Sequence, residues 1–376
     1  MFDFLIIGGG VVGTFIAREL SHYETNVLML EKEKDLSQIQ TTHNSALVHS
    51  PVSISKDKGE LKAKLAELGN KMYRELAPKM NVPVLMNGAY ILAHSEEEME
   101  AIKAIAEEAN RRGVDEYRFI DRDEMLKQEP HLSDTVIGGL DMFTAMTADT
   151  YILTKHLAAN ATRNGAKIKT SQKVVSIKAQ EDHFVVETAD KKKYLTRYII
   201  NAAGIHNATI AQMIEKNVPY KMRPHRGEYY VLSSEAKGYV RKTLFPLPTK
   251  VSKGILIIPQ PDGTIRLGPT STYQEDLDKA EVTKEGLNEV KDVVNNMIKN
   301  IPYHLVKKTY AGLRSTLDID DFYIKPSKEH PRFIHVAGID SPGVTAAPAI
   351  AKYLLANVIL PKEPLKMKES VDLYGA

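Results

Sequence analysis

The chain has 376 residues, of which 43% are hydrophobic and 26% charged, as expected for a soluble globular protein with two domains. The net charge is +2 and no basic arm is present, so we expect no nucleic-acid partner. The absence of cysteine excludes disulfides, thiolate catalysis and iron–sulfur ligation. No apolar run approaches the roughly 18 residues of a membrane span. We therefore expect a cytoplasmic protein, and leave peripheral membrane contact and oligomeric state open.

Residues 1–31 have the order of a dinucleotide-binding strand–helix–strand unit. Apolar residues 4–7 lead into a glycine-rich turn, a helix is expected over 14–23, and a second apolar run ends at Glu31. The glycines let the backbone approach a pyrophosphate, the helix N-terminus favours its charge, and the acid can bind ribose hydroxyls. We assign to the cofactor site Gly8, Gly10, Val11, Val12, Gly13, Glu31 and Lys32. The alternative is a glycine-rich turn without a ligand.

The following segments predict helices and one hairpin. Amphipathic or capped patterns predict helices over residues 58–76, 95–113 and 150–164. The second of these begins with a capping box, formed by Ser95 and Glu98. Residues 82–93 predict a β-hairpin, because Asn87 and Gly88 suit a type I′ turn.

Strand patterns dominate the rest of the chain. Expected strands cover residues 167–170, 174–178, 183–187, 194–197 and 198–204, and the third and fourth of them form a hairpin. Beyond residue 219 an antiparallel sheet is expected from residues 228–232, 254–259 and 264–268. A helix over 284–299 follows, and a strand over 333–338 leads into a closing helix.

The parallel-sheet patterns occur at the start, middle and end of the chain, with the antiparallel patterns between them. This order predicts one nucleotide-binding domain that is interrupted twice by a substrate domain. We assign the nucleotide-binding domain to residues 1–80, 145–215 and 326–376, and the substrate domain to residues 81–144 and 216–325.

Three further features favour FAD over NAD as the dinucleotide. Small residues at the end of a strand, Ala203 and Gly204, would let a cofactor lie against the backbone. The hydroxyls of Thr42 and Ser45 could lie near the pyrophosphate. A helix starting near Ser341 would stabilise negative charge on a reduced flavin. We add to the cofactor site Thr42, Ser45, Val174, Val175, Ala203, Gly204, Gly338, Ser341, Gly343, Val344 and Thr345.

Several motifs together resemble the D-amino-acid-oxidase-like superfamily of FAD oxidoreductases. They occupy residues 43–49, 223–229, 253–259, 267–269, 311–314 and 340–348. The chain is similar in particular to the type II (mollicute-type) α-glycerophosphate oxidases, and also to the related L-2-hydroxyglutarate dehydrogenases. The resemblance implies an α/β fold, with a Rossmann-like FAD-binding domain of the glutathione-reductase type. This domain would be interrupted by a substrate domain with a mixed or antiparallel sheet and helices.

The resemblance also implies an activity, the oxidation of sn-glycerol 3-phosphate to dihydroxyacetone phosphate. Hydride would pass to flavin N5, and the flavin would be reoxidised by O2, giving H2O2, or by another acceptor such as a quinone. Another anionic 2-hydroxy or 2-amino acid, such as L-2-hydroxyglutarate, is the alternative substrate. A nicotinamide-dependent dehydrogenase and a non-catalytic flavin-binding protein are alternatives of other classes.

The resemblance assigns roles to four residues of this chain. His49 would take the hydroxyl proton, for which a neutral imidazole is suited. Arg314 and Lys253 would bind an anionic group, with help from Ser341, and we count Arg314 with His49 as a catalytic residue. The alternatives are a structural histidine, salt bridges for the two cations, and helix capping by Ser341. We expect no metal site, because no motif with metal-ligand spacing occurs.

Two positions depart from the pattern of similar proteins. Ala46 stands where they usually have glycine, and Ser50-Pro51 follows the candidate base. Pro51 fixes φ, so we expect no helix directly after His49. The run that follows also lacks the tyrosines of many hydroxy-acid relatives, which weakens the hydroxyglutarate alternative.

Overall fold

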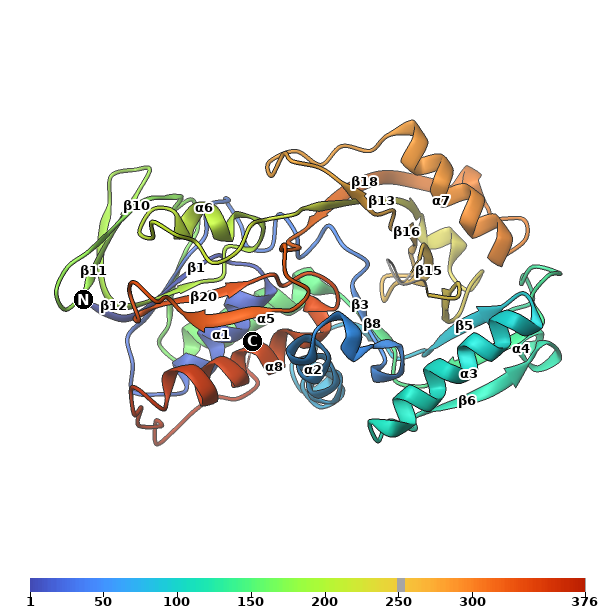
Figure 1. Ribbon diagram of the computed structural model, residues 1–376, viewed down its shortest axis with the longest axis horizontal. Helices are drawn as coiled ribbons and strands as arrows, with labels where there is room; N and C mark the ends of the chain where they lie inside the picture. Colours follow the sequence, from blue (N-terminus) through green and yellow to red (C-terminus); the bar gives the residue numbers. More distant parts are fainter. Residues whose placement is uncertain (249–253, 376) are drawn as a thin grey trace.

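The computed structural model describes residues 1–248 and 254–375, and its strands form two large sheets and one small one (Figure 1). An eight-stranded sheet contains β1 (Phe2–Ile7), and a nine-stranded sheet contains β13 (His225–Leu232). The first sheet lies at the left of Figure 1 and the second at the right. The α/β fold with parallel and antiparallel sheets, as predicted from the sequence, is confirmed.

The parallel part of the eight-stranded sheet is centred on β1. This strand pairs in parallel with β2 (Val27–Leu30) on one side and with β12 (Lys193–Asn201) on the other. In turn, β9 (Lys167–Lys169) extends the sheet beyond β2, and β20 (Phe333–Ala337) pairs with the end of β12. The central strands are buried along nearly their whole length, which is why they read as continuous apolar runs.

The predicted hairpin of residues 183–187 and 194–197 is confirmed. The strand β11 (Phe184–Thr188) pairs antiparallel with the first half of β12, and Phe184 lies opposite Thr196. The strand predicted over 198–204 is the second half of β12 rather than a separate strand. A single strand of nine residues therefore joins the hairpin to the parallel part of the sheet.

Four helices pack side by side along the eight-stranded sheet (Figure 1). They contact one another in the order α5 (Thr150–Arg163), α1 (Val11–Ser21), α8 (Gly343–Leu354) and α2 (Glu60–Lys79). The helix α1 begins directly after the glycine turn, earlier than predicted. The contact between α2 and α8 is especially close, because a Cβ on Gly69 would lie 1.9 Å from the carbonyl oxygen of Thr345. Gly69 thus allows the two backbones to meet.

The nine-stranded sheet confirms the antiparallel arrangement predicted for the later chain. Its order is β17 (Thr272–Tyr273), β13, β16 (Ile265–Gly268), β15 (Leu256–Pro259), β14 (Thr243–Phe245), β5 (Ala89–Ala93), β7 (Gly138–Met142) and β6 (Tyr117–Asp121), with β18 (Val306–Arg314) paired to β13. Within the described part of this sheet, only β14 and β5 pair in parallel. The helices α3 (Glu96–Arg111) and α7 (Lys284–Met297) pack against this sheet. The capping bond of α3 is present, since Ser95 Oγ accepts from Glu98 N at 3.2 Å.

The hairpin predicted over residues 82–93 is wrong. The strand β4 (Val84–Leu85) pairs instead with β8 (Met146–Ala148) in a small sheet that also contains β3 (Leu47–Val48), whereas β5 joins the nine-stranded sheet. Gly88 has a positive φ of 71°, but Asn87 does not, so no type I′ turn forms. The side chain of Asn87 donates to the carbonyl of Arg241, which ties this corner to a distant segment.

The two unusual positions near His49 have local explanations. Pro51 begins a 3-10 helix, Pro51–Ser53, so the expectation that no helix follows His49 is wrong. Proline fits the first helical position because its missing N–H needs no partner there. Ala46 has a positive φ of 55°, and its N–H donates to Asn44 Oδ1 at 2.6 Å. The backbone here has the left-handed form that glycine favours, although this chain has alanine.

The strands of the two large sheets follow the predicted alternation along the chain. The eight-stranded sheet draws on residues 2–30, 167–201 and 323–337, and the nine-stranded sheet on residues 89–142 and 225–314. The exact domain boundaries stay a prediction. In the described ranges, none of the helices combines the length and apolar character that a membrane crossing requires.

Candidate active site

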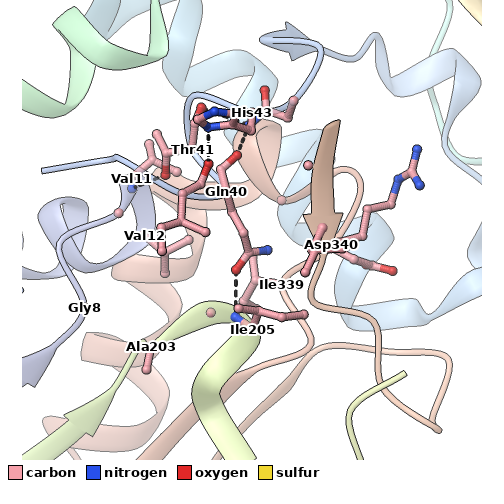
Figure 2. Close-up of a pocket in the computed structure, with 18 of the residues that line it drawn as sticks. Gly8, Val11, Val12, Gln40, Thr41, His43, Ala203, Ile205, Ile339 and Asp340 are labelled. Atoms are coloured by element: carbon pink, nitrogen blue, oxygen red, sulfur yellow. Dashed lines mark hydrogen bonds between the residues drawn. The ribbon is translucent and has the colours of Figure 1, made fainter. Parts of the chain in front are cut away.

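A cavity of about 670 Å³ is lined by residues of both large sheets (Figure 2). On the side of the eight-stranded sheet it lies at the carboxyl ends of β1, β2 and β20, where Ile7, Leu30 and Val336 line it. Ligands of open parallel α/β sheets bind at this edge. On the other side it is lined by Tyr229 of β13 and by Arg314, the last residue of β18.

The glycine turn forms one end of the cavity. Gly8 has a φ of 115°, and a Cβ there would lie 2.4 Å from the carbonyl oxygen of Ala202. A Cβ on Gly13 would lie 2.0 Å from the carbonyl oxygen of Gly8, so α1 can approach β1 only with glycine here. Gly10 caps α1 without a side chain, and the first turn of the helix lines the cavity, where Thr41 Oγ1 accepts from the N–H of Val11. Such an end suits the phosphates of a dinucleotide.

Glu31 is fixed at the end of β2, in the cavity wall. Its Oε2 accepts from Gly9 N at 2.6 Å, and its Oε1 accepts from Glu33 N at 2.8 Å. The same end contains Lys32, whose Nζ lies 3.1 Å from His206 Nε2. Burial, with a further contribution from Lys32, lowers the pKa of His206. This end therefore offers an oriented carboxylate for ribose hydroxyls.

His49 lies directly after β3 and is buried in the wall of the cavity. Its N–H donates to Thr345 Oγ1 at 2.9 Å, and its carbonyl accepts from Asn70 Nδ2 at 2.9 Å. Its ring lies 6.0 Å from that of Phe245, centroid to centroid. Helices α8 and α2 thus hold the backbone of His49 from both sides, while its side chain lines the cavity.

Arg314 brings a positive charge into the same cavity. Its Nη2 donates to the carbonyl of Thr270 at 3.0 Å, whereas Nη1 is buried without a hydrogen-bond partner. Within the described residues no carboxylate forms a salt bridge with it, so the structural alternative has no support there. Burial, and after it the charge of Arg314, lowers the pKa of His225, another lining residue.

Of the other two predicted substrate residues, only Ser341 can be placed. It is exposed and lines the cavity, and it forms no capping bond to α8, whose N-cap is Pro342. The capping alternative for Ser341 is therefore not observed. Lys253 lies outside the described residues, although its neighbour Gly254 lines the cavity.

Most of the predicted cofactor residues line the cavity. These are Gly8, Gly10, Val11, Val12, Gly13, Glu31, Lys32, Ser45, Val174, Ala203, Gly204, Ser341, Gly343 and Val344. Four others do not line it. The hydroxyl of Thr42 donates to the carbonyl of Ser37, Val175 is exposed, Gly338 packs against Leu317, and Thr345 accepts from the N–H of His49.

The sequence analysis missed several lining residues. Thr41, next to the predicted Thr42, accepts from Val11 N at 3.0 Å and so contacts the first residue of α1. Gln40 reaches across to accept from Ile205 N at 2.7 Å, as Figure 2 shows. Both residues are polar and stand next to Thr42, but no local sequence pattern shows which of the three side chains lines the cavity. Other lining residues that were missed are Lys62, Gln172, Lys173, His206 and Asp340.

The fold and the cavity define a dinucleotide-binding protein. The same cavity contains Arg314, so it also offers a positively charged site for a second ligand. The tight glycine turn, the N-terminus of α1 in the cavity lining and the anchored Glu31 fit the adenosine and pyrophosphate parts of FAD. Residues 3–357 match the family of FAD-dependent oxidoreductases known as DAO, and the chain belongs to this family. The resemblance drawn from the sequence motifs is thereby confirmed, and FAD is the cofactor.

Individual relatives extend over nearly the whole chain. A glycerol 3-phosphate dehydrogenase of Caloramator mitchellensis is 34% identical over 374 residues, covering 100% of this chain and 77% of that protein. A glycerol 3-phosphate oxidase of Mycoplasma genitalium is 30% identical over 358 residues, covering 93% and 92%. The structure of dithionite-reduced L-α-glycerophosphate oxidase from Mycoplasma pneumoniae, with FAD bound, aligns with a TM-score of 0.91 and 27% identity, covering 98% of this chain and 97% of that one.

Proposed function

We propose that this protein is an FAD-dependent enzyme that oxidises sn-glycerol 3-phosphate to dihydroxyacetone phosphate. One observation carries the proposal: Arg314 presents a buried guanidinium nitrogen without a partner in the cavity that also contains His49 and the glycine turn. A guanidinium binds phosphate through its planar fork of donors. Family membership and the relatives named glycerol 3-phosphate oxidase or dehydrogenase support the same substrate.

Each site residue of this chain would have its own role in the reaction. Arg314 binds the phosphate, Ser341 donates a hydrogen bond, and Lys253 stays a predicted second cation. His49 accepts the proton of the C2 hydroxyl, and Thr345 and Asn70 hold its backbone beside the cavity. When bound, FAD supplies the two-electron acceptor for the hydride that leaves C2.

The decisive experiment follows the visible spectrum of the purified yellow protein under anaerobic conditions. We expect glycerol 3-phosphate to bleach the flavin and L-2-hydroxyglutarate to leave it oxidised. Bleaching by the second compound alone would refute the proposed substrate in favour of another anionic 2-hydroxy acid. A protein that neither compound bleaches would refute the proposed function. In air, formation of hydrogen peroxide identifies oxygen as the acceptor, and its absence indicates a quinone or another carrier.

The role of His49 is tested by rapid mixing of the His49→Asn variant. We expect the variant to stay yellow but to reduce its flavin about 100-fold or more slowly, because general base catalysis is lost. The matched control is His94→Asn, a change outside the cavity lining that should keep the wild-type rate. An unchanged rate in His49→Asn would exclude proton transfer to this residue.

A further inference from the structure

Lys62 and Asp340 form an ion pair in the cavity wall that the proposed mechanism does not use. Lys62 Nζ lies 2.8 Å from Asp340 Oδ1, and the two side chains are only 12% and 13% exposed. Both residues line the cavity, and Figure 2 shows Asp340 on the side away from Val11 and Val12 in this view. The two groups are close, but within the described residues Oδ1 accepts no hydrogen bond of normal geometry. The attraction between Lys62 and Asp340 is therefore that of an ion pair.

The lysine is held in place by the start of α2. The carboxylate of Asp321 accepts from the N–H groups of Leu61 and Lys62, at 3.0 and 2.8 Å. These two bonds satisfy free donors in the first turn of the helix. The backbone of Lys62 is thus fixed beside the cavity, and its side chain reaches Asp340.

Asp340 is connected to both substrate-binding residues. It directly precedes Ser341, and its Oδ2 accepts from Thr316 Oγ1 at 3.3 Å. Thr316 follows closely after Arg314, at the end of β18. The neighbouring Ile339 carbonyl accepts from Ser315 Oγ at 2.9 Å. Asp340 therefore lies where the two segments that carry Arg314 and Ser341 meet.

Among the acids that line the cavity in the described residues, Asp340 is the one that adjoins Ser341. The described lining contains two other acids, Glu31 and Asp278, and both lie at the cofactor end. Glu31 is bound by backbone N–H groups, and Asp278 Oδ1 is 3.6 Å from His206 Nε2. Without a counter-charge, Asp340 would repel a phosphate bound by Arg314.

We propose that Lys62 is a positioning residue for substrate selectivity: it neutralises Asp340, so that the subsite of Arg314 and Ser341 stays positive and accepts an anion. This inference rests on the proposed function. A paired carboxylate keeps the hydrogen bond to Thr316 that joins the two segments, while its charge is cancelled. Asp340 thus joins the two segments through its hydrogen bond to Thr316, and Lys62 cancels the charge of Asp340.

The test compares Lys62→Met, Asp340→Asn and the double variant as holoenzymes. We expect Lys62→Met to raise KM for glycerol 3-phosphate at least about tenfold, because a like charge then faces the anion, while kcat changes little. The double variant should recover most of this loss, since the repelling charge is gone. Lys62→Arg should behave as the wild type. The matched control is Lys64→Met, an exposed lysine of the same helix outside the lining.

Binding of inorganic phosphate to the oxidised holoenzyme gives a readout that does not depend on turnover. The dissociation constant of phosphate, measured by titration, should rise in Lys62→Met and fall back in the double variant. Wild-type KM and phosphate affinity in Lys62→Met, or a double variant as weak as the single one, would overturn the inference. Failure of glycerol 3-phosphate to reduce the wild type would refute the proposed function instead, and the phosphate titration would still decide the role of Lys62.

Discussion

Glu129 links the stability of the protein to pH through a segment that supports His49. It follows α4 (Arg122–Gln128) and is buried, and its Oε1 accepts from the N–H groups of Arg241 and Lys242 at 2.9 and 2.7 Å. These residues precede β14, whose Phe245 contacts the ring of His49. Burial raises the pKa of Glu129 to about 7, although the two N–H groups act in the opposite direction.

The raised pKa means that the folded protein favours the protonated acid. Below pH 4.5 Glu129 is protonated in both states, and its contribution to stability is complete. As the pH rises from 4.5 to about 7, the unfolded chain loses the proton first, and the free energy of unfolding decreases. The difference between the two pKa values corresponds to about 3 kcal/mol. Most of this loss is complete above pH 7.

The variant Glu129→Gln tests this reasoning, because the amide carbonyl can still accept both N–H groups but cannot ionise. We expect it to be more stable than the wild type at pH 8, by up to about 3 kcal/mol, and to differ little at pH 4.5. Urea unfolding of the holoenzyme at several pH values measures the difference. Glu97→Gln, at an exposed position of α3, is the control. A difference that is the same at pH 4.5 and pH 8 would refute the argument.

Three further predictions concern the cavity and its support. Gly13→Ala should abolish FAD binding, seen as loss of absorbance near 450 nm, because its Cβ would lie 2.0 Å from the carbonyl oxygen of Gly8; a fully yellow variant would contradict this. Gly69→Ala should lower the free energy of unfolding by about 1–3 kcal/mol through overpacking against Thr345, measured by urea unfolding, and unchanged stability would show that α2 can shift freely. Arg314→Lys should raise KM about tenfold or more, because a bidentate donor is lost, and an unchanged KM in steady-state assays would place the phosphate elsewhere.

The part of the site that lies within one short segment was predictable from the sequence. The order of strand, glycines, helix and acid places Gly8, Gly13 and Glu31 at the carboxyl ends of two neighbouring strands. A hydrogen bond between near neighbours in the chain then orients the carboxylate of Glu31. The hairpin at β11 and β12 was predictable for the same reason. In both cases local chemistry and the final fold require the same residues.

The sequence-based predictions fail where segments far apart in the chain determine the local structure. Asn87 and Gly88 have good turn chemistry, yet β4 and β5 find partners far along the chain and enter different sheets. Thr41 rather than Thr42 faces α1 because of how the loop packs against the helix. The place of His49 came from the resemblance to known proteins, since its anchors, Asn70 and Thr345, follow no local pattern.

The anchoring of His49 also has a consequence for how the enzyme is made. During synthesis, the glycine turn, β3 and α2 leave the ribosome long before Thr345 and the rest of α8. Until then the N–H of His49 lacks its acceptor, and the wall formed by Gly343 and Val344 does not exist. The cavity is therefore completed late in synthesis, when α8 supplies both the acceptor for the N–H of His49 and the lining at Gly343 and Val344.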